Sequence, residues 1–334
     1  MTIEQQVAQL FVWGFEGYEA TAPLKRLLKK YHPGGLILFR RNIHDPEQVQ
    51  HLTAELQRAG RSHGAPLLMG IDQEGGRVAR LHWFAEYPPA AVYGKIYQRQ
   101  KGVHFIEAVA RLMAWELKNV GVNLNFAPVL DVNSNPKNPI IGDRAFSHDA
   151  HVVAKTAVPF FRGLLSEGVI PCGKHFPGHG DTKTDSHLEL PRVEVSRESW
   201  RRVSLVPFRE AIRQGIPTLM TAHIICQNLD PDRPATLSRK IIHDLLREEL
   251  GFSGVLFTDD LFMKALAKYS LIESMVLALE AGNDAFLVCK EFETRYELME
   301  QLGAEVQKSP SLKRRVEESV ARIALLKKKY LKNQ

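Results

Sequence analysis

Residues 150–176 read AHVVAKTAVPFFRGLLSEGVIPCGKHF and hold, in order, a helical pattern, a glycine and a strand. Ala150–Glu167 places apolar residues at helical spacing, and Gly168 follows at a position where helices commonly end. Val169–Phe176 then begins as a continuous apolar run, as expected for a parallel strand that is covered on both faces. The order of helix, glycine and strand predicts the α/β class.

The same unit recurs along the chain, with Gly121, Gly215 and Gly282 each standing between a helical pattern and an apolar run. Eight strands that alternate with helices predict a single (β/α)8 TIM-type barrel, with residues 1–334 as one domain. The predicted strands are Leu10–Phe15, Gly35–Phe39, Leu67–Asp72, Val122–Val129, Val169–Phe176, Thr218–His223, Gly254–Asp259 and Asp284–Cys289. The clearest predicted helices are Pro46–Ala59, Phe105–Val120, Ala150–Glu167, Arg197–Gln214, Ser238–Leu250 and Leu271–Ala281.

Three further features complete this prediction. No G-x-G-x-x-G follows the first apolar run, which argues against a dinucleotide-binding sheet. Tyr87–Gln98 is Pro-rich, with Pro88 and Pro89 near its start, and is predicted to be a surface loop. Leu312–Leu331 is predicted to be a last helix on the flank of the barrel.

Charge and cysteine content indicate which partners and which redox compartment the protein has. The net charge is +6, and the densest basic run, residues 325–330, is typical of a solvated helix end rather than a nucleic-acid surface. The three cysteines, Cys172, Cys226 and Cys289, are far apart and odd in number, so we expect buried free thiols and a reducing compartment.

The search for targeting signals in the sequence also bears on the cellular location. The N-terminal residues are polar, and no stretch approaches the roughly 20 apolar residues that span a bilayer. We therefore expect a cytoplasmic protein with no membrane and no nucleic-acid partner. A monomer is favoured, although the sequence does not determine the oligomeric state.

Polar side chains collect where the predicted strands end. In barrels of this type the active site lies at the C-terminal ends of the strands. A single aspartate there is commonly a helix N-cap, but several that converge indicate a functional site. The residues at these ends are Asp72, Asp131, Lys174, His175, His223, Asp259 and Asp260.

The richest of these segments is the loop after the fifth strand, residues 174–187, which reads KHFPGHGDTKTDSH. One interpretation is a hydrogen-bonded loop whose histidines are structural, and His179 fits it as well as it fits a site. A metal site is a second interpretation, although the first strand lacks the histidines expected of a barrel metallohydrolase. Its ligands would be His175, His179, Asp181 and His187.

The third interpretation rests on Asp185 and His187, which stand two residues apart. A carboxylate that accepts from one imidazole nitrogen fixes the tautomer and favours the protonated ring. The other nitrogen then donates a proton to a leaving group and later takes one from water. This pair would therefore act as general acid and then as general base.

These motifs together resemble glycoside hydrolase family 3, and specifically its β-N-acetylglucosaminidase branch. The resemblance extends over most of the chain, and the long loop motif is its most specific part. The segments that carry it are Gly70–Arg80 (GIDQEGGRVAR), Asn125–Asp131 (NFAPVLD), Ile141–Phe146 (IGDRAF), Lys174–His187, Thr221–His223 (TAH) and Phe257–Leu261 (FTDDL).

The resemblance implies a role for each matching residue. Asp259 would be the nucleophile of a retaining glycosidase, and His187 the acid/base assisted by Asp185. Asp131 and His223 would line the site, and neither a metal nor a cofactor would be needed. The residues implied in sugar binding are Asp72, Arg80, Arg144, Lys174 and His175.

The resemblance also implies a substrate. It would be terminal β-linked N-acetylglucosamine, with peptidoglycan-derived muropeptides as natural substrates in cell-wall recycling. Gln73 in place of a frequent histidine, Thr258 in place of serine, and residues 262–264 depart from the family pattern and leave acceptor preference open.

Four alternatives stay open. A β-glucosidase or β-xylosidase of the same family would usually lack the residue 174–187 loop. A non-catalytic sugar-binding barrel would lack one of Asp259, His187 and Asp185, and all three are present. A metal enzyme would be inhibited by chelators. Phosphate could replace water as acceptor, because a deprotonated histidine is neutral and repels an anion less than a carboxylate does.

Overall fold

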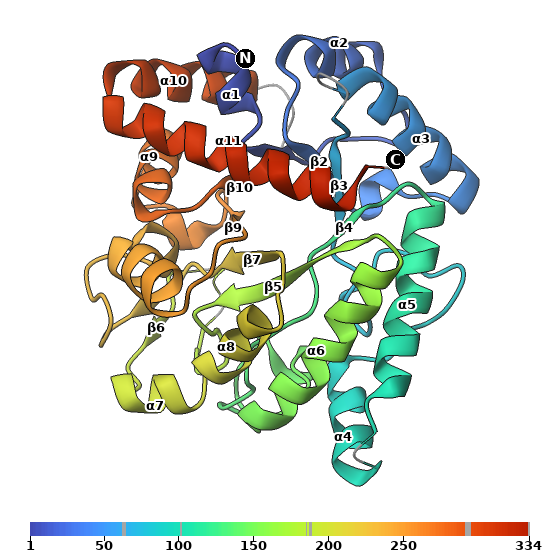
Figure 1. Cartoon of the computed structure of the whole chain (residues 1–334), viewed down its shortest axis with the longest axis vertical. Coiled ribbons are helices and arrows are strands. Elements are labelled where there is room, and N and C mark those ends of the chain that lie inside the picture. The colour runs from blue at the N-terminus through green and yellow to red at the C-terminus, as the bar shows by residue number, and fades with distance from the viewer. Residues whose placement is uncertain (62–64, 101, 185, 187–188, 291–294, 333–334) are drawn as a thin grey trace.

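The computed structural model describes residues 1–61, 65–100, 102–184, 186, 189–290 and 295–332, and its centre is a closed barrel of parallel strands (Figure 1). Each predicted strand overlaps one barrel strand, so the predicted (β/α)8 architecture is confirmed. Around the barrel the order is β1, β10, β9, β7, β5, β4, β3, β2. The bounds are β1 Phe11–Trp13, β2 Gly35–Leu38, β3 Leu68–Ile71, β4 Leu124–Asn125, β5 Ile170–Phe176, β7 Thr218–Thr221, β9 Val255–Asp260 and β10 Ala285–Val288.

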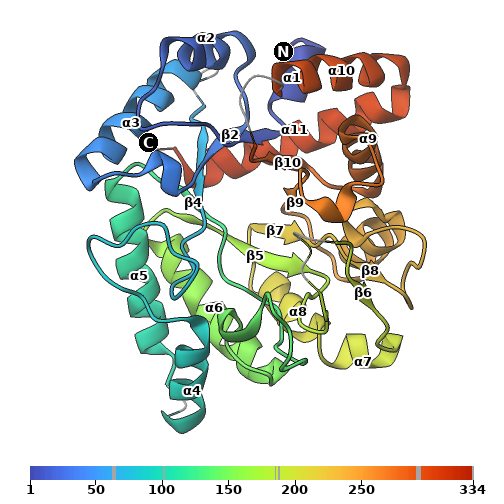
Figure 2. The same ribbon diagram turned by 180° about the vertical axis from the view of Figure 1, so that it is seen from behind.

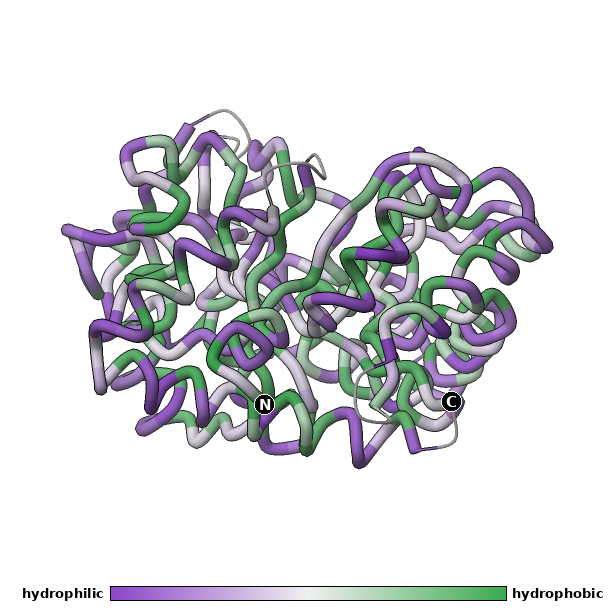
Figure 3. Tube along the Cα trace, turned by 90° about the horizontal axis from the view of Figure 1, so that it is seen from above, coloured by the Kyte–Doolittle hydropathy of each residue, from purple (hydrophilic) through white to green (hydrophobic). Residues whose placement is uncertain are grey.

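The helices surround the barrel, and the hydropathy-coloured trace shows hydrophilic residues gathered on the outer turns (Figures 2 and 3). Strand residues are buried on both faces as a result, which explains their continuous apolar runs. The α-helices are α1 Ile3–Ala8, α2 Ala22–Tyr31, α3 Pro46–Gly60, α4 Ala90–Gln100, α5 His104–Asn119, α6 Ala150–Ser166, α7 Arg197–Arg202, α8 Leu205–Arg213, α9 Leu271–Ala281, α10 Arg295–Lys308 and α11 Pro310–Tyr330.

Shorter elements complete the chain. A small separate sheet pairs β6 (Arg192–Val193) with β8 (Ile225–Cys226), and a π-helix, η4, occupies Lys240–Glu249. The 3-10 helices are η1 Arg40–Asn42, η2 Gly142–Arg144, η3 Ala235–Leu237 and η5 Lys264–Leu266. In the described ranges, no helix is both long and apolar enough to cross a membrane.

Local signals account for most helix ends. The Asp45 side chain accepts from the backbone N–H of Gln48 at the start of α3, as an N-cap residue does. Gly168 after α6 has φ of 86°, a left-handed conformation that glycine adopts without steric cost. The three cysteines are free and buried, as predicted.

The prediction of a loop over Tyr87–Gln98 was wrong, because α4 begins at Ala90. Pro88 and Pro89 precede the helix, where a missing N–H group costs nothing. Tyr93 is 2% exposed and packs against three phenylalanine rings whose centroids lie 6.2 to 6.5 Å away. This burial, which involves α5 and α6, stabilises a helix that the prolines obscured in the sequence.

The prediction of one helix over Arg197–Gln214 was also wrong, because α7 and α8 are separate helices. Val203 ends α7 with ψ of −75° and φ of −119°. Pro207 lies in the first turn of α8. In a continuous helix its ring would clash with the carbonyl of Val203 and its missing N–H would break the ladder.

Asp284, which directly precedes β10, holds together the end of the barrel opposite the strand C-termini. Its carboxylate is fully buried and accepts from Arg247 at 2.6 Å, Arg322 at 2.9 Å and Arg315 at 3.4 Å. Burial raises the pKa of this carboxyl, but the three guanidinium groups outweigh burial and hold the pKa below its usual value. One buried carboxylate therefore joins η4 and α11 to the sheet.

Lys327 of α11 places an ammonium group inside the protein. The residue is 4% exposed, and Nζ donates to the neutral side-chain oxygen of Gln9 at 3.3 Å. Among the residues that the structure describes, no carboxylate pairs with this group. Burial lowers the pKa of Lys327 to about 7.

We therefore expect Lys327→Met to raise the free energy of unfolding, by about 1–3 kcal/mol near pH 6. The folded-state pKa is below the ordinary 10.5, so the cost of burying the charge is fully present below about pH 7. This cost disappears as pH rises toward 10.5, where the unfolded chain also loses the proton. Urea unfolding at pH 6 and pH 9 measures the difference. A substitution effect that is the same at both pH values, or destabilising at pH 6, would contradict the account.

Candidate active site

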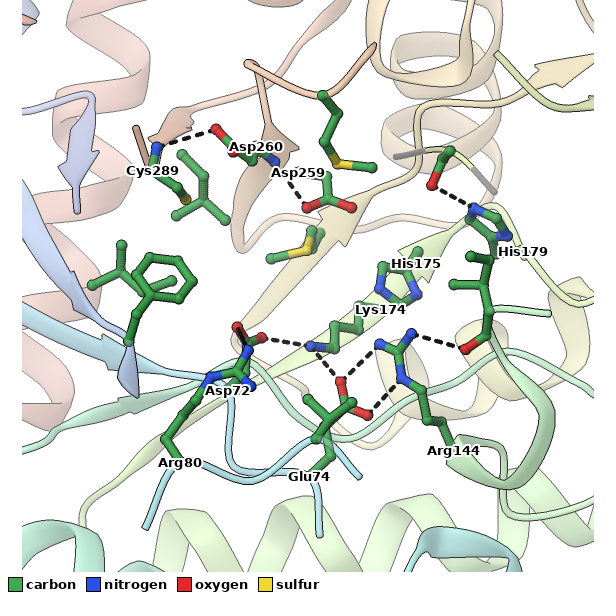
Figure 4. A pocket seen from close by; sticks show the side chains of 18 of the residues that line it. Asp72, Glu74, Arg80, Arg144, Lys174, His175, His179, Asp259, Asp260 and Cys289 are labelled. Carbon is green, nitrogen blue, oxygen red and sulfur yellow. Dashed lines mark hydrogen bonds and ion pairs between the residues drawn. The ribbon is translucent and has the colours of Figure 1, made fainter. Parts of the chain in front are cut away.

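A cavity of about 380 Å³ opens at the C-terminal ends of the barrel strands (Figure 4). Loops after β2, β3, β5, β9 and β10 supply most of its wall. It brings together Asp259 and all five residues implied in sugar binding. Its lining comprises Ile37, Phe39, Arg41, Asp72, Glu74, Val78, Arg80, Ile140, Arg144, Lys174, His175, His179, Ser186, Met220, Asp259, Asp260, Met263, Leu287, Cys289 and Lys290.

Asp259 lies near the end of β9, with its carboxylate facing the cavity (Figure 4). The backbone N–H of Asp260 donates to Asp259 Oδ1 at 2.8 Å. Burial raises the pKa of this carboxyl, but nearby His223 and His175 and the Asp260 N–H outweigh burial, so the pKa lies below its usual value. Asp259 is therefore an anion at neutral pH and is available to attack an electrophilic carbon.

Asp260 has a different environment although it is the next residue. Its Oδ1 accepts from the backbone N–H groups of Cys289 at 3.1 Å and Phe262 at 3.2 Å. Burial raises the pKa of Asp260, and the neighbouring charge of Asp259 adds to this effect. Asp260 thus fixes the end of β9 against the segment after β10 and orients its neighbour.

A cluster of charged side chains forms the opposite wall. Lys174 Nζ lies 2.8 Å from Asp72 Oδ1 and 2.7 Å from Glu74 Oε1. Arg80 donates to Asp72 Oδ2 at 3.3 Å, and Arg144 donates through Nε and Nη2 to both oxygens of Glu74 at 2.8 Å. We call these five residues the charged corner, and Figure 4 shows their side chains meeting at one side of the cavity.

Glu74 is the member of the charged corner that sequence reasoning did not identify. It is 6% exposed, and burial raises its pKa. The charges of Arg144 and Lys174 outweigh burial and hold the pKa well below its usual value. Its partners are 70 and 100 residues away in the chain, so only its place in the segment Gly70–Arg80 could have drawn attention to it.

Gln73, which departs from the family pattern, lies behind this wall. It is 1% exposed, and its Oε1 accepts from the backbone N–H groups of Arg80 and Leu81. Its Nε2 donates to the carbonyl of Leu81. Gln73 therefore shapes the loop that carries Arg80 and does not itself reach the cavity.

His175 is held by a buried carboxylate. Its Nδ1 lies 2.7 Å from Asp131 Oδ2, and the backbone N–H of His179 donates to Asp131 Oδ1 at 2.6 Å. Because the carboxylate accepts from Nδ1–H, Nε2 is the ring nitrogen left for a ligand. Asp131 is fully buried behind the cavity wall, and it supports the site rather than lining it.

His223 also lies one layer behind the cavity. It is 1% exposed, and burial lowers its pKa below the usual value. Its Nε2 lies 3.1 Å from the backbone carbonyl of Asp260, and its Nδ1 lies 2.8 Å from the Thr236 hydroxyl. His223 thus supports the strand end that carries Asp259.

His179 reaches the cavity and connects two parts of its loop. Its Nδ1 lies 2.8 Å from the Thr182 hydroxyl and its Nε2 lies 3.2 Å from the Ser186 hydroxyl. Burial and neighbouring His175 lower the pKa of His179 to about 4. Through these two contacts His179 joins Thr182 to Ser186 within the loop.

Asp185 and His187, the predicted acid/base pair, lie outside the described residues. Asp181, one of the possible metal ligands, accepts from the hydroxyls of Ser134 at 2.6 Å and Ser204 at 3.3 Å. It therefore turns toward serines and does not line the cavity. Within the described ranges, no group of three or more His, Cys, Asp or Glu side chains is placed to hold a metal ion.

The chemistry of this cavity follows from its two walls. One wall presents a carboxylate with a lowered pKa. The other presents donors and acceptors that ion pairs hold in place, which suits a ligand rich in hydroxyl groups. Such an arrangement can hold a sugar with its reactive carbon against a nucleophile.

Comparison with known proteins agrees with this interpretation. A sequence model described as the glycosyl hydrolase family 3 N terminal domain matches residues 2–326. A β-hexosaminidase of Nitrosomonas eutropha is 40% identical over 277 residues, which cover 81% of this chain and 78% of the relative.

Two solved structures are similar over almost the whole chain. The first is a family 3 β-N-acetylglucosaminidase from Paenibacillus sp. strain FPU-7, with 41% identity, a TM-score of 0.93 and coverage of 99% of this chain but 63% of that chain. The second is NagZ from Neisseria gonorrhoeae in complex with N-trifluoroacetyl-D-glucosamine, with 33% identity, a TM-score of 0.80 and coverage of 94% and 92%. The chain thus spans less than two thirds of the length of the Paenibacillus relative.

Proposed function

The chain belongs to glycosyl hydrolase family 3, and from this premise we propose that it is a retaining exo-β-N-acetylglucosaminidase. Relatives named β-hexosaminidase and β-N-acetylglucosaminidase support a β-N-acetylhexosaminidase activity. The observation that carries the proposal is the Asp259 carboxylate, which faces the charged corner across one cavity.

Asp259 attacks the anomeric carbon and forms a covalent glycosyl-enzyme as the bond to the leaving oxygen breaks. Its lowered pKa keeps it ionised for this attack. Positive charge develops on the sugar ring in the transition state, and the carboxylate also stabilises that charge. Water then releases the sugar with its original anomeric configuration.

His187 donates a proton to the leaving oxygen and then accepts one from the attacking water, with Asp185 holding its imidazole. Ser186, which stands between Asp185 and His187 in the sequence, lines the cavity. Its hydroxyl lies 3.2 Å from Nε2 of His179. This contact supports the assignment, because it holds the neighbouring residue of the acid/base pair beside the sugar site.

We expect His187→Ala to lose most turnover on natural saccharides, on the order of 10²–10⁴-fold. Substrates with an activated aryl leaving group should be spared by comparison, because their departing oxygen needs little protonation. Steady-state rates on dinitrophenyl and alkyl N-acetylglucosaminides measure this difference. An equal loss on both substrates would count against the acid role.

The charged corner binds the non-reacting part of the sugar. Asp72 accepts from hydroxyl groups, while Lys174, Arg144 and Arg80 donate to hydroxyl oxygens or to the acetamido carbonyl. The free Nε2 of His175 adds a further polar group at the cavity wall. These contacts fix the orientation of the anomeric carbon toward Asp259.

The direct test is release of nitrophenol from aryl β-N-acetylglucosaminide and aryl β-glucoside, compared side by side. We expect a strong preference for the N-acetyl substrate. Preference for the glucoside would keep the family but overturn the proposed substrate. Absence of release from both would overturn the enzymatic proposal itself.

Muropeptides from peptidoglycan are the natural substrates that we propose, with a role in cell-wall recycling in the cytoplasm. Similarity to NagZ, solved with an N-acylated glucosamine, supports a pocket for the N-acetylglucosaminyl end. Three free, buried cysteines agree with a reducing compartment. Release of N-acetylglucosamine from purified muropeptide fragments, followed by mass spectrometry, checks this part of the proposal.

A further inference from the structure

Glu74 balances charge at the cavity and contacts two of the residues proposed to bind the sugar, Arg144 and Lys174. The charged corner has three cations, Lys174, Arg144 and Arg80, against the carboxylates of Asp72 and Glu74. With the Asp259 carboxylate across the cavity, the formal charges of these groups sum to zero. Arg41, Lys290 and Asp260 also line the cavity. Among the six groups that face one another here no charge is left over, so they suit a neutral sugar and give an anion no advantage.

Glu74 contributes its negative charge through direct ion pairs with two of the cations. Its Oε1 accepts from Arg144 Nη2 at 2.8 Å and from Lys174 Nζ at 2.7 Å, and its Oε2 accepts from Arg144 Nε at 2.8 Å. All three side chains are nearly buried, with exposed fractions of 5%, 11% and 3% for Glu74, Arg144 and Lys174. Screening by solvent is weak for such pairs.

The same contacts decide which donors remain free. Lys174 uses two of its three N–H groups on Asp72 and Glu74. Arg144 uses Nε and Nη2 on Glu74 and Nη1 on the carbonyl of Ile140 at 3.2 Å, which leaves further N–H groups on the same planar fork. Both side chains line the cavity, so their free N–H groups are available to a bound ligand.

We infer that Glu74 is a positioning and specificity-determining residue, which aims the free N–H groups of Arg144 and Lys174 at sugar hydroxyls and whose charge keeps the pocket selective for uncharged over anionic ligands. The inference rests on the proposed function for the identity of the sugar. The part of the inference that concerns charge depends only on the ion pairs of the protein and not on which sugar binds.

Two variants separate charge from position. Glu74→Gln removes the charge and keeps the shape, so one positive charge is left uncompensated among Arg144, Lys174 and Arg80. Glu74→Asp keeps the charge and shortens the side chain, so the two cations lose their fixed orientation. The double variant Glu74→Gln/Arg144→Gln restores the balance of charge without restoring the geometry.

Inorganic sulfate is the probe for charge, because it is a dianion at pH 7 and a poor nucleophile. We expect sulfate to bind Glu74→Gln about tenfold or more tightly than wild type at matched ionic strength, since one unpaired charge at contact distance is worth at least that factor. Isothermal calorimetry and inhibition of aryl glycoside turnover both measure it. Glu74→Asp and the double variant should bind sulfate like wild type.

Deoxy sugars are the probe for position. Wild type should discriminate between aryl N-acetylglucosaminide and its 3-, 4- and 6-deoxy analogues, whereas Glu74→Asp should lose discrimination for at least one of them. This comparison tests the inference even if Glu74→Gln does not fold. Glu116→Gln, which changes another buried carboxyl at 5% exposure on α5, is the control and should match wild type in both measurements.

Unchanged sulfate affinity in a folded Glu74→Gln, or equal losses on all sugars for Glu74→Asp, would overturn the inference and leave Glu74 with a purely structural role. Failure of the proposed function is separable. If wild type releases no nitrophenol, calorimetry with sulfate still decides the charge argument on the folded protein.

Discussion

Asp259→Ala should reduce turnover of aryl β-N-acetylglucosaminide by on the order of 10⁴-fold or more, because the covalent route is lost. The carboxylate lies at the end of β9 with a lowered pKa, and the Asp260 N–H orients it at 2.8 Å. No other carboxylate in the described cavity is free for the task, since Asp72 and Glu74 are ion-paired and Asp260 accepts two backbone N–H groups. Steady-state kinetics with an activated aryl substrate measure the loss.

The control for this variant is binding. Asp259→Ala keeps the charged corner and should still bind N-acetylglucosamine. Added azide should restore part of the turnover and yield the α-glycosyl azide, because a small anion enters from the face that Asp259 vacates. Turnover that matches wild type without azide would contradict the nucleophile assignment.

Asp284→Ala should lower the free energy of unfolding by about 3–5 kcal/mol, because it removes the buried carboxylate that Arg247, Arg315 and Arg322 share. A loss of this size is a large share of the stability of an ordinary domain. Because the cluster lies at the start of β10, away from the cavity, the folded fraction should keep its KM. Urea unfolding followed by circular dichroism measures the change.

The exposed Asp244 offers a matched control. Its side chain is 61% exposed and pairs with His243, so Asp244→Ala should change stability by less than about 0.5 kcal/mol. Equal effects of the two substitutions would show that the buried arginine cluster does not need its carboxylate.

Fold class was predictable because the barrel strands are buried on both faces and therefore stand out as apolar runs. Glycines such as Gly168 marked the helix ends for a steric reason that is local. Two errors came from prolines. Pro88 and Pro89 masked the start of α4, and Pro207 interrupts a stretch whose apolar spacing resembled one helix. In each case a proline within the first turn of a helix, or just before that turn, determined where the helix begins.

The site was predictable where a residue lies at a strand end. Asp259, Asp72 and Lys174 meet in one cavity as expected from the barrel. Glu74 was not predictable, because its role depends on charges that approach it from distant loops. The placement of Asp131 and His223 behind the wall likewise depends on packing that no local pattern encodes.

Other site residues also have properties that the sequence alone did not predict. The neutrality of His179 follows from burial and from the nearby His175, neither of which the sequence reveals. Asp185 and His187 lie outside the described residues, and their role stays a prediction from the sequence motif. Kinetics of His187→Ala therefore carry the test of that assignment.

The central claim is that Asp259 forms a covalent bond to the sugar, and trapping of that intermediate tests it most directly. A fluorinated N-acetylglucosaminide with a good leaving group forms the glycosyl-enzyme faster than water releases it. Mass spectrometry of the digested protein should then find one added sugar on the peptide that contains Asp259. A sugar on another residue, or rapid turnover to the α-anomer with no labelled protein, would contradict the account.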